Sequence, residues 1–352
     1  MDTPEQLHGQ QKVARLINPG PEFSFEIETQ DAPSLGSQEA LVELEVTGLC
    51  GTDLGLARGY LGKCESILGH EGIGRVVAVG RECTKATLGQ RVAVGWLRDA
   101  CGTCRVCLRG DETRCQTQVF SGRDVPGTLA RFTVVPDRFL LPVPDDLSAE
   151  VLAPIICAGV TAYKALKVCD AMAGSWVAIS GAAGGVGTLA IQYARAMGYR
   201  PIAIDGGERQ KQLCLDLGAE KFIDFTKDKD IASAVSRETD GSLCSAFIEC
   251  SGAIPAYQTA PSCLDYFGVL VCVGIPPPTE KVSFHPLQLI DKGIQFKGSI
   301  VGSRLDTSEA IEFVRRGLVT PRSKVVKLEE LGQYVNQLDK IDGKLIVQVS
   351  DT

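Results

Sequence analysis

The stretch from Trp176 to Asp205 constrains the fold of this 352-residue chain more than any other. An apolar, strand-like run at Trp176–Ser180 leads into a glycine-rich turn, which is followed by a helical pattern that extends to about Met197. A second strand-like run ends at Asp205, eighteen residues beyond Gly187. A strand, a glycine turn, a helix and a strand that ends in an acidic residue are typical of a dinucleotide-binding βαβ unit.

The glycine turn is one residue longer than the usual GxGxxG pattern, and it predicts a contact with the pyrophosphate of a dinucleotide. Glycine lets backbone N–H groups approach a phosphate closely at the start of a helix. The predicted coenzyme-binding residues of the turn are Gly181, Gly184, Gly185, Val186 and Gly187.

Asp205 indicates which coenzyme the turn receives. Its carboxylate can accept hydrogen bonds from an adenosine ribose, and its charge would repel a 2′-phosphate, so NAD is favoured over NADP. Arg209 is the opposing signal, because an arginine can accommodate that phosphate. The alternative for Arg209 is a solvated position on the surface.

Strand-like and helical runs alternate after Ser175, which predicts a parallel, doubly wound sheet. The first 150 residues instead hold short runs with period-2 alternation, as expected for antiparallel strands. We therefore expect an α/β protein with two domains. Residues 157–302 form the Rossmann dinucleotide-binding domain. Residues 1–156, completed by 303–352, form a mostly-β catalytic domain that binds zinc.

A thiol, an imidazole and a carboxylate occur close together in the sequence at Cys50, His70 and Glu71. These groups are the kinds of ligand that zinc prefers, so they predict a catalytic zinc site. Asp53 supplies a carboxylate that can orient the histidine. Thr52 supplies a hydroxyl group two residues from the thiol.

An open catalytic zinc site requires a third strong protein ligand, and Cys157 is the candidate. Taken alone, a cysteine with apolar neighbours is more often a buried structural thiol. Four further cysteines lie in a polar, loop-like segment whose spacing suits a closed, structural zinc site rather than a set of small core residues. They are Cys101, Cys104, Cys107 and Cys115.

Composition excludes several classes of function. The net charge is −7 and no run of Lys or Arg occurs, which argues against nucleic acid as a partner. Apolar runs such as Val269–Val273 are strand-sized, so no membrane span is expected. The polar N-terminus does not have the pattern of a secretory signal, and the fourteen cysteines suit reduced thiols. We expect a cytoplasmic protein.

Taken together, these residues resemble the zinc-dependent medium-chain alcohol dehydrogenases, in particular the yeast and fungal branch. The similarity covers nearly the whole chain after about residue 10. The motifs that carry it are Gly69-His70-Glu71, the four-cysteine loop, Ile156–Leu166, Ile179–Gly185, Ala203–Glu208, Phe222–Lys227 and Gly298–Gly302.

The resemblance implies a GroES-like catalytic domain, two zinc ions per chain and NAD(H). It assigns the catalytic zinc to Cys50, His70 and Cys157, with Glu71 close enough to exchange with water. It places Thr52 against the reacting oxygen. Trp96 would then line the substrate pocket, and Lys344 would lie near the coenzyme pyrophosphate. Members of this branch are commonly tetramers or dimers, so a homo-oligomer is expected.

Three positions depart from the pattern of the branch. Gly51 replaces a histidine that contacts the coenzyme phosphate. Gly55 replaces the histidine that ends the proton relay from the substrate, and no replacement is visible in the sequence. Leu61 replaces a tryptophan that narrows the substrate pocket, which points to a roomier pocket.

The function expected from these features is hydride transfer between NAD(H) and an alcohol, an aldehyde or a ketone, with a substrate larger than ethanol. Two alternatives remain. One is an NADPH-dependent carbonyl reductase on the same fold. The other is a non-catalytic zinc-binding protein, which the four-cysteine loop alone would allow.

Overall fold

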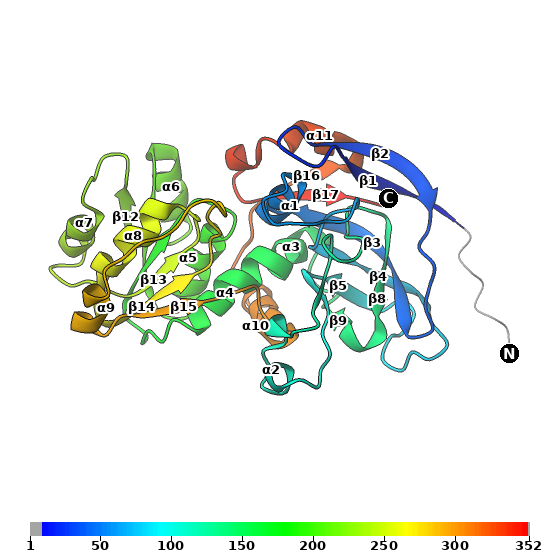
Figure 1. Cartoon of the computed structure of the whole chain (residues 1–352), viewed down its shortest axis with the longest axis horizontal. Coiled ribbons are helices and arrows are strands. Elements are labelled where there is room, and N and C mark those ends of the chain that lie inside the picture. The colour runs from blue at the N-terminus through cyan, green and yellow to red at the C-terminus, as the bar shows by residue number, and fades with distance from the viewer. Residues whose placement is uncertain (1–8, 351–352) are drawn as a thin grey trace. The chain divides into compact units, whose positions relative to one another are not determined.

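The computed structural model describes residues 9–350, which divide into two compact units (Figure 1). Within that range, the β-rich unit comprises residues 9–157, 303–308 and 321–350. The parallel-sheet unit comprises residues 158–302 and 309–320. The α/β fold class expected from the sequence, with a mostly-β part and a parallel sheet, is confirmed.

The β-rich unit is built on a seven-stranded sheet in the order β16-β17-β3-β4-β5-β9, with β8 also paired to β3. Strand β3 is the centre of this sheet, because it pairs with β4, β8 and β17 and buries most of its length. The strands of the unit are β1 (Gln10–Ile17), β2 (Ser24–Asp31), β3 (Glu39–Leu49), β4 (Gly72–Val79), β5 (Arg91–Val94), β6 (Leu97–Asp99), β7 (Val119–Phe120), β8 (Phe132–Pro136), β9 (Leu141–Pro142), β16 (Ser323–Lys327) and β17 (Lys344–Gln348). Its helices are α1 (Gly51–Ala57), α2 (Arg105–Leu108), α3 (Ala149–Pro154) and α11 (Leu331–Tyr334).

The parallel-sheet unit contains a six-stranded sheet in the order β12-β11-β10-β13-β14-β15, and every neighbouring pair is parallel. The strand order reverses between β10 and β13, and ligands of such sheets bind at the carboxyl ends of the strands at this switch point. The strands are β10 (Trp176–Ser180), β11 (Arg200–Asp205), β12 (Lys221–Asp224), β13 (Cys244–Glu249), β14 (Leu264–Cys272) and β15 (Gln295–Gly298). The helices are α4 (Val160–Lys167), α5 (Gly187–Ala196), α6 (Glu208–Asp216), α7 (Ile231–Glu238), α8 (Ile254–Cys263) and α9 (Leu287–Lys292).

The C-terminal part differs from the expectation that residues 303–352 complete the first domain. Residues 309–320 belong to the parallel-sheet unit, and they include the second half of helix α10 (Arg304–Arg315). The hydroxyl of the buried Tyr193 donates a hydrogen bond of 3.0 Å to the carbonyl of Ala310. The Phe313 ring lies 5.7 Å from the rings of both Tyr163 and Tyr193. This aromatic cluster holds the segment in the parallel-sheet unit, a placement that the sequence pattern does not predict.

Two helical predictions have different outcomes. The sequence pattern of Leu147–Lys167 predicts a largely helical segment, and the structure agrees: α3, a π-helical turn at Ile155–Gly159 and α4 follow one another directly. By length and composition Ala149–Lys167 could cross a membrane, but 83% of its apolar window is buried inside the protein. The pattern of Leu328–Leu338 also predicts a helix, and this prediction is wrong for a continuous helix, since only α11 and two 3-10 turns form. Gly332, Val335 and Asn336 are weak helix formers, which explains the break.

Candidate active site

Two clusters of metal-ligating side chains lie in the β-rich unit. In the first, the ligand atoms of Cys50, His70, Glu71 and Cys157 all lie within 4.8 Å of one another. Cys50 is the N-cap of α1 and follows β3 directly, while His70 and Glu71 precede β4. Cys157 lies in the π-helical turn after α3, and such turns are frequent at functional sites. The structure thus brings together all four residues that the sequence predicted for a catalytic zinc.

The pairing of β3 with β4 places three of these ligands. Thr47 lies opposite Gly72, so the end of β3 and the start of β4 meet at the same edge of the sheet. Gly48 leaves the space that Glu71 occupies, because a Cβ at residue 48 would come within 1.9 Å of the Glu71 Oε2. Any other residue at position 48 would displace the carboxylate.

The buried Asp53 carboxylate orients the cluster. Its Oδ1 lies 3.0 Å from the His70 Nδ1 and accepts a 3.0 Å hydrogen bond from the Gly69 N–H, while Oδ2 accepts one of 3.0 Å from the Cys50 N–H. With Nδ1–H donated to Asp53, the other ring nitrogen of His70 keeps its lone pair for a metal. These are the contacts that the orienting role predicted for Asp53 requires.

The donor set fits zinc. The Sγ atoms of Cys50 and Cys157 are 3.9 Å apart. Two thiolates bound tetrahedrally at about 2.3 Å from one zinc ion are about 3.8 Å apart. Two thiols, one imidazole and a carboxylate with one unpartnered oxygen make a site with three strong ligands and one exchangeable position.

Electrostatics favour the thiolate form at one of the two cysteines, Cys50. The hydrogen bond from the Cys157 thiol lowers the pKa of Cys50 well below its usual value, against the effect of burial and with help from the charge of Lys344. The same hydrogen bond, together with burial, raises the pKa of Cys157. Burial disfavours a charged His70, yet the neighbouring Asp53 carboxylate raises the pKa of this histidine well above its usual value. A divalent cation deprotonates thiols that coordinate it, so both cysteines suit metal binding.

Lys344 holds one oxygen of Glu71. Its Nζ lies 2.6 Å from the Glu71 Oε1, and the two side chains are 7% and 0% exposed. Burial raises the pKa of Glu71 to about 7, although the charge of Lys344 opposes this shift. The second oxygen, Oε2, is buried without a hydrogen-bond partner, which suits a group that can approach a metal. The role of Lys344 at the coenzyme pyrophosphate stays a prediction.

The predicted substrate-pocket residues lie around this cluster in different ways. Thr52 Oγ1 accepts a hydrogen bond of 3.8 Å from the Cys50 thiol. The Trp96 ring packs edge-to-face against His70 at 5.1 Å and stacks on Phe120 at 4.7 Å. Sequence reasoning missed Phe120, whose only signal is an aromatic residue five positions after the last cysteine of the loop.

Leu61 lies against Gly55. A Cβ at residue 55 would come within 2.9 Å of the Leu61 Cδ1. Two of the three departures from the family pattern therefore touch each other. Gly51, in the first turn of α1, is exposed.

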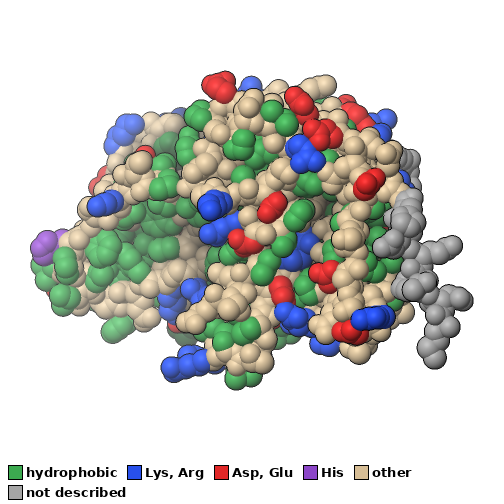
Figure 2. All heavy atoms as spheres, turned by 45° about the vertical axis from the view of Figure 1, so that its right-hand side comes forward, with side chains coloured by type: hydrophobic (Ala, Val, Ile, Leu, Met, Phe, Trp, Pro, Cys, Tyr) green, Lys and Arg blue, Asp and Glu red, His purple; other side chains and the backbone are tan. Residues whose placement is uncertain are grey.

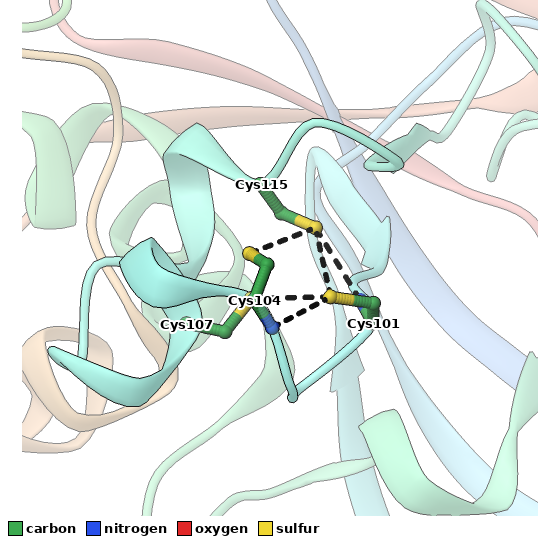
Figure 3. A group of neighbouring side chains, drawn as sticks. All are labelled: Cys101, Cys104, Cys107 and Cys115. Carbon is green, nitrogen blue, oxygen red and sulfur yellow. Dashed lines mark hydrogen bonds between the residues drawn. The ribbon is translucent and has the colours of Figure 1, made fainter.

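The second cluster consists of the four cysteines of the loop, whose Sγ atoms face one another in Figure 3. The Sγ atom of Cys115 lies 3.6 Å from that of Cys101 and 4.0 Å from that of Cys104, and the Sγ atoms of Cys101 and Cys107 are 4.0 Å apart. Backbone N–H bonds from Thr103 and Cys104 lower the pKa of Cys101 to about 5. Four sulfurs at these separations suit a closed tetrahedral zinc site without a position for water.

The glycine turn lies at the switch point of the parallel sheet. Gly181 has a φ of +61°, and a Cβ there would meet the Cα of Ser251 at 2.9 Å, so only glycine fits. A Cβ on Gly187, at the start of α5, would come within 2.2 Å of the Gly181 carbonyl oxygen. Gly184 donates a backbone hydrogen bond of 3.0 Å to that carbonyl. Gly185 follows it, and Val186 is the N-cap of α5.

Asp205 ends β11 beside this turn. Its Oδ2 accepts a hydrogen bond of 2.8 Å from the Ala183 N–H, and its Oδ1 accepts one of 2.8 Å from the Gly206 N–H. Each oxygen keeps a further lone pair for a ribose hydroxyl. Arg209, in the first turn of α6, is exposed. These contacts fit a dinucleotide coenzyme.

Comparison with known proteins gives the same result. A model of the alcohol dehydrogenase GroES-like domain matches residues 36–145, and a zinc-binding dehydrogenase model matches residues 185–316. An alcohol dehydrogenase of Geobacillus stearothermophilus is 38% identical over 93% of this chain and 96% of its own length. Alcohol dehydrogenase 2 of Emericella nidulans is 36% identical over 99% of this chain and 100% of its own. The structure of an acetophenone reductase from Geotrichum candidum, solved with NAD, superposes with a TM-score of 0.83 at 25% identity and covers 99% of this chain and 98% of its own.

Asp53→Asn tests the orienting network. The amide nitrogen of asparagine cannot accept a hydrogen bond, so at least one of the three donors at Asp53 loses its partner. We expect affinity for the first zinc to fall about 10- to 100-fold, the usual effect of losing such a supporting group. Zinc content under competition with a chelator measures the loss.

Cys104→Ser is the matched control. It should release the zinc of the four-cysteine loop and leave the affinity of the first site unchanged. If Asp53→Asn retained both zinc ions as tightly as the unaltered protein, the role given to Asp53 would be wrong.

Proposed function

Because this chain belongs to the zinc-dependent medium-chain alcohol dehydrogenase family and is an alcohol oxidoreductase, we propose that it transfers hydride between NAD(H) and an alcohol, aldehyde or ketone larger than ethanol. The observation that carries this proposal is the open cluster of Cys50, His70, Cys157 and Glu71. A second zinc in the four-cysteine loop is part of the proposal.

Each residue of the cluster has a distinct task. Zinc supplies Lewis-acid polarisation of the substrate oxygen, and the nicotinamide supplies hydride chemistry. Asp53 fixes the ring of His70 and the backbone at Cys50. The Thr52 hydroxyl would accept the proton of the substrate alcohol while it passes its own proton on, through the coenzyme ribose, to water. Lys344 restrains one oxygen of Glu71 and leaves the other to exchange at the metal.

The rate of turnover with a panel of alcohols and carbonyl compounds tests this function. The panel should include ethanol and bulky alcohols, each with NAD and NADP, alongside measurement of zinc per chain. We expect two zinc ions, activity with NAD and the highest kcat/KM with a substrate larger than ethanol. The relative named an acetophenone reductase supports a larger carbonyl substrate. Preference for ethanol would contradict the substrate proposal, and preference for NADP would favour the carbonyl reductase alternative.

Asp205→Ser tests the coenzyme preference. The variant removes the charge that would repel a 2′-phosphate and leaves the exposed Arg209 able to bind it. We expect the ratio of kcat/KM for NADP over NAD to rise by about 10- to 100-fold, the value of one or two charged hydrogen bonds. An unchanged ratio would show that Asp205 does not select the coenzyme. Glu208→Ser, an exposed acidic neighbour, is the control and should leave the ratio unchanged.

Substitutions at Gly55 and Leu61 together test whether the missing relay histidine limits proton release. Because Leu61 fills the space beside Gly55, Gly55→His alone would clash with it, whereas Gly55→His/Leu61→Ala gives the ring room. We expect kcat of the double variant to exceed that of Leu61→Ala by about tenfold, below the usual range for general acid–base groups because the ring acts at a distance.

The pH dependence of kcat is the second measurement on this pair. A histidine in the relay should add an inflection near pH 6.5, the ordinary pKa of that side chain. A double variant with the same kcat and the same pH profile as Leu61→Ala would show that proton release does not limit turnover.

A homo-oligomer through the parallel-sheet unit is also part of the proposal. Large apolar side chains are exposed on that unit, and Figure 2 shows hydrophobic side chains gathered on the face in view. The exposed large apolar side chains of the parallel-sheet unit include Tyr266, Phe267, Ile275, Phe284, Leu287 and Ile290. Edge strand β15 has no partner on its outer side within residues 9–350. An edge strand beside apolar surface favours pairing with another chain.

Ile290→Glu tests this interface. Ile290 is 73% exposed on α9, and a buried, unpaired carboxylate would oppose association. We expect light scattering to show a smaller particle than for the unaltered protein. Leu88→Glu, at an exposed site on the β-rich unit, should not change the mass. If the unaltered protein were monomeric, the oligomer proposal would be wrong.

A cytoplasmic location completes the proposal. It is supported by the cysteines, none of which forms a disulfide in the described residues.

A further inference from the structure

Glu249 is a fully buried carboxylate that the proposed chemistry does not use. It is the last residue of β13, and its side chain is 0% exposed. In the register of the parallel sheet it lies between Ser180, the last residue of β10, and Cys272, the last residue of β14. No Lys, Arg or His in residues 9–350 forms an ion pair with it. A buried charge without a cation is retained only where hydrogen bonds satisfy it.

Backbone and hydroxyl donors satisfy this carboxylate from two strand ends. Oε1 accepts hydrogen bonds from the Ser180 hydroxyl at 3.1 Å, the Ser251 N–H at 2.9 Å and the Gly252 N–H at 3.1 Å, and also from the Ser251 hydroxyl. Oε2 accepts a 3.1 Å bond from the Gly252 N–H. The carboxylate therefore bridges β10 and the loop after β13, across the point where the strand order reverses.

The loops around Glu249 are in direct backbone contact. A Cβ on Gly181 would meet the Ser251 Cα at 2.9 Å, and one on Gly252 would meet the Ile275 carbonyl oxygen at 2.8 Å. The Gly274 N–H donates a 2.8 Å hydrogen bond to the Glu249 carbonyl. Any shift of the 250–252 loop must therefore move the glycine turn or the segment after β14. The carboxylate sets the spacing among these three segments.

We propose that Glu249 is a positioning residue for the coenzyme: it fixes the 250–252 loop against the glycine turn and so holds the nucleotide crevice open at the switch point. Ligands of doubly wound sheets bind in this crevice, outside the carboxyl ends of the strands. The proposal rests on the proposed function, since it takes the crevice to receive NAD(H). Glu249 acts through the loops and does not itself touch the coenzyme, because its carboxylate is enclosed.

The Ser251 and Gly252 N–H groups are committed to Glu249, so they are not the donors that receive the pyrophosphate. That task falls to the glycine turn and the start of α5. The 250–252 loop is instead a wall of the crevice. Loosening this wall should weaken coenzyme binding without altering the zinc ligands, which belong to the other unit.

Glu249→Gln is the principal test. The variant keeps the size of the side chain but presents one amide N–H₂ to backbone donors, so at least one buried hydrogen bond is lost. We expect the Kd for NADH, measured by fluorescence titration well below the melting temperature, to rise about tenfold, with unchanged zinc content. The KM for the coenzyme should rise while kcat changes less than twofold.

Thr239→Val is the matched control for stability. Thr239 is also buried and donates a 2.8 Å hydrogen bond to the Val235 carbonyl, but it lies between α7 and β13, before the amino end of the strand whose carboxyl end holds Glu249. This variant should lower the melting temperature by several degrees and leave the Kd for NADH within twofold. If Thr239→Val weakened binding as much as Glu249→Gln, the effect would be one of general stability and the proposal would fall.

Ser180→Ala is a second test of the positioning role of Glu249. It removes one donor from Glu249 and leaves the carboxylate otherwise bonded, so it should fold even if Glu249→Gln does not. We expect the Kd for NADH to rise about threefold. An unchanged Kd in Ser180→Ala, or in a folded Glu249→Gln, would overturn the proposal. Failure of the unaltered protein to bind NADH or NADPH would instead refute the proposed function.

Discussion

The geometry of the candidate active site depends on one buried carboxylate, that of Asp53. It joins the backbone at Cys50, which follows β3, to the backbone at Gly69 and the ring of His70, which precede β4. Each of these donors would be costly to bury alone, and the carboxylate would be costly to bury without them. Satisfying them together fixes the two zinc-ligand segments relative to each other before any metal binds. The strand pairing sets where the site lies, and the hydrogen bonds of Asp53 fix the orientation of the ligand side chains within it.

The C-terminal strand β17 supplies a contact to the site that Asp53 does not, the ion pair between Lys344 and Glu71. Strand β17 pairs with β3 near the other end of the sequence, with Leu345 opposite Leu49, and this pairing places Lys344 beside Glu71. An ion pair between residues 273 positions apart can form only after the sheet is complete. The charge state of Glu71, and with it the exchangeable position of the site, thus depends on the C-terminal strand. Strand β17 therefore provides the charge that faces Glu71 as well as apolar side chains of the core.

Features that depend on local pattern could be predicted from the sequence, and those that depend on distant contacts could not. Cys50, His70 and the glycine turn are recognisable because ligand chemistry and helix geometry act over short spacings. The placement of residues 309–320 follows from contacts of Tyr193 and Phe313 that are far apart in the chain. Phe120 and Glu249 are single residues without a repeating pattern. Their importance follows only from what the fold places next to them.

The two buried glutamates show how the same chemical group can serve opposite purposes. Glu249 accepts hydrogen bonds from Ser180, Ser251 and Gly252, so a movement of its carboxylate breaks several hydrogen bonds and the group acts as a rigid spacer. Glu71 has one oxygen held by Lys344 and the other without a partner, so it can move at little cost toward a cation. An unpartnered buried oxygen carries a desolvation cost that only a metal or a mobile water can relieve. That cost is retained beside the sulfur atoms of Cys50 and Cys157, where exchange at a metal would be useful. It is avoided at Glu249, where the proposed role requires a fixed spacing.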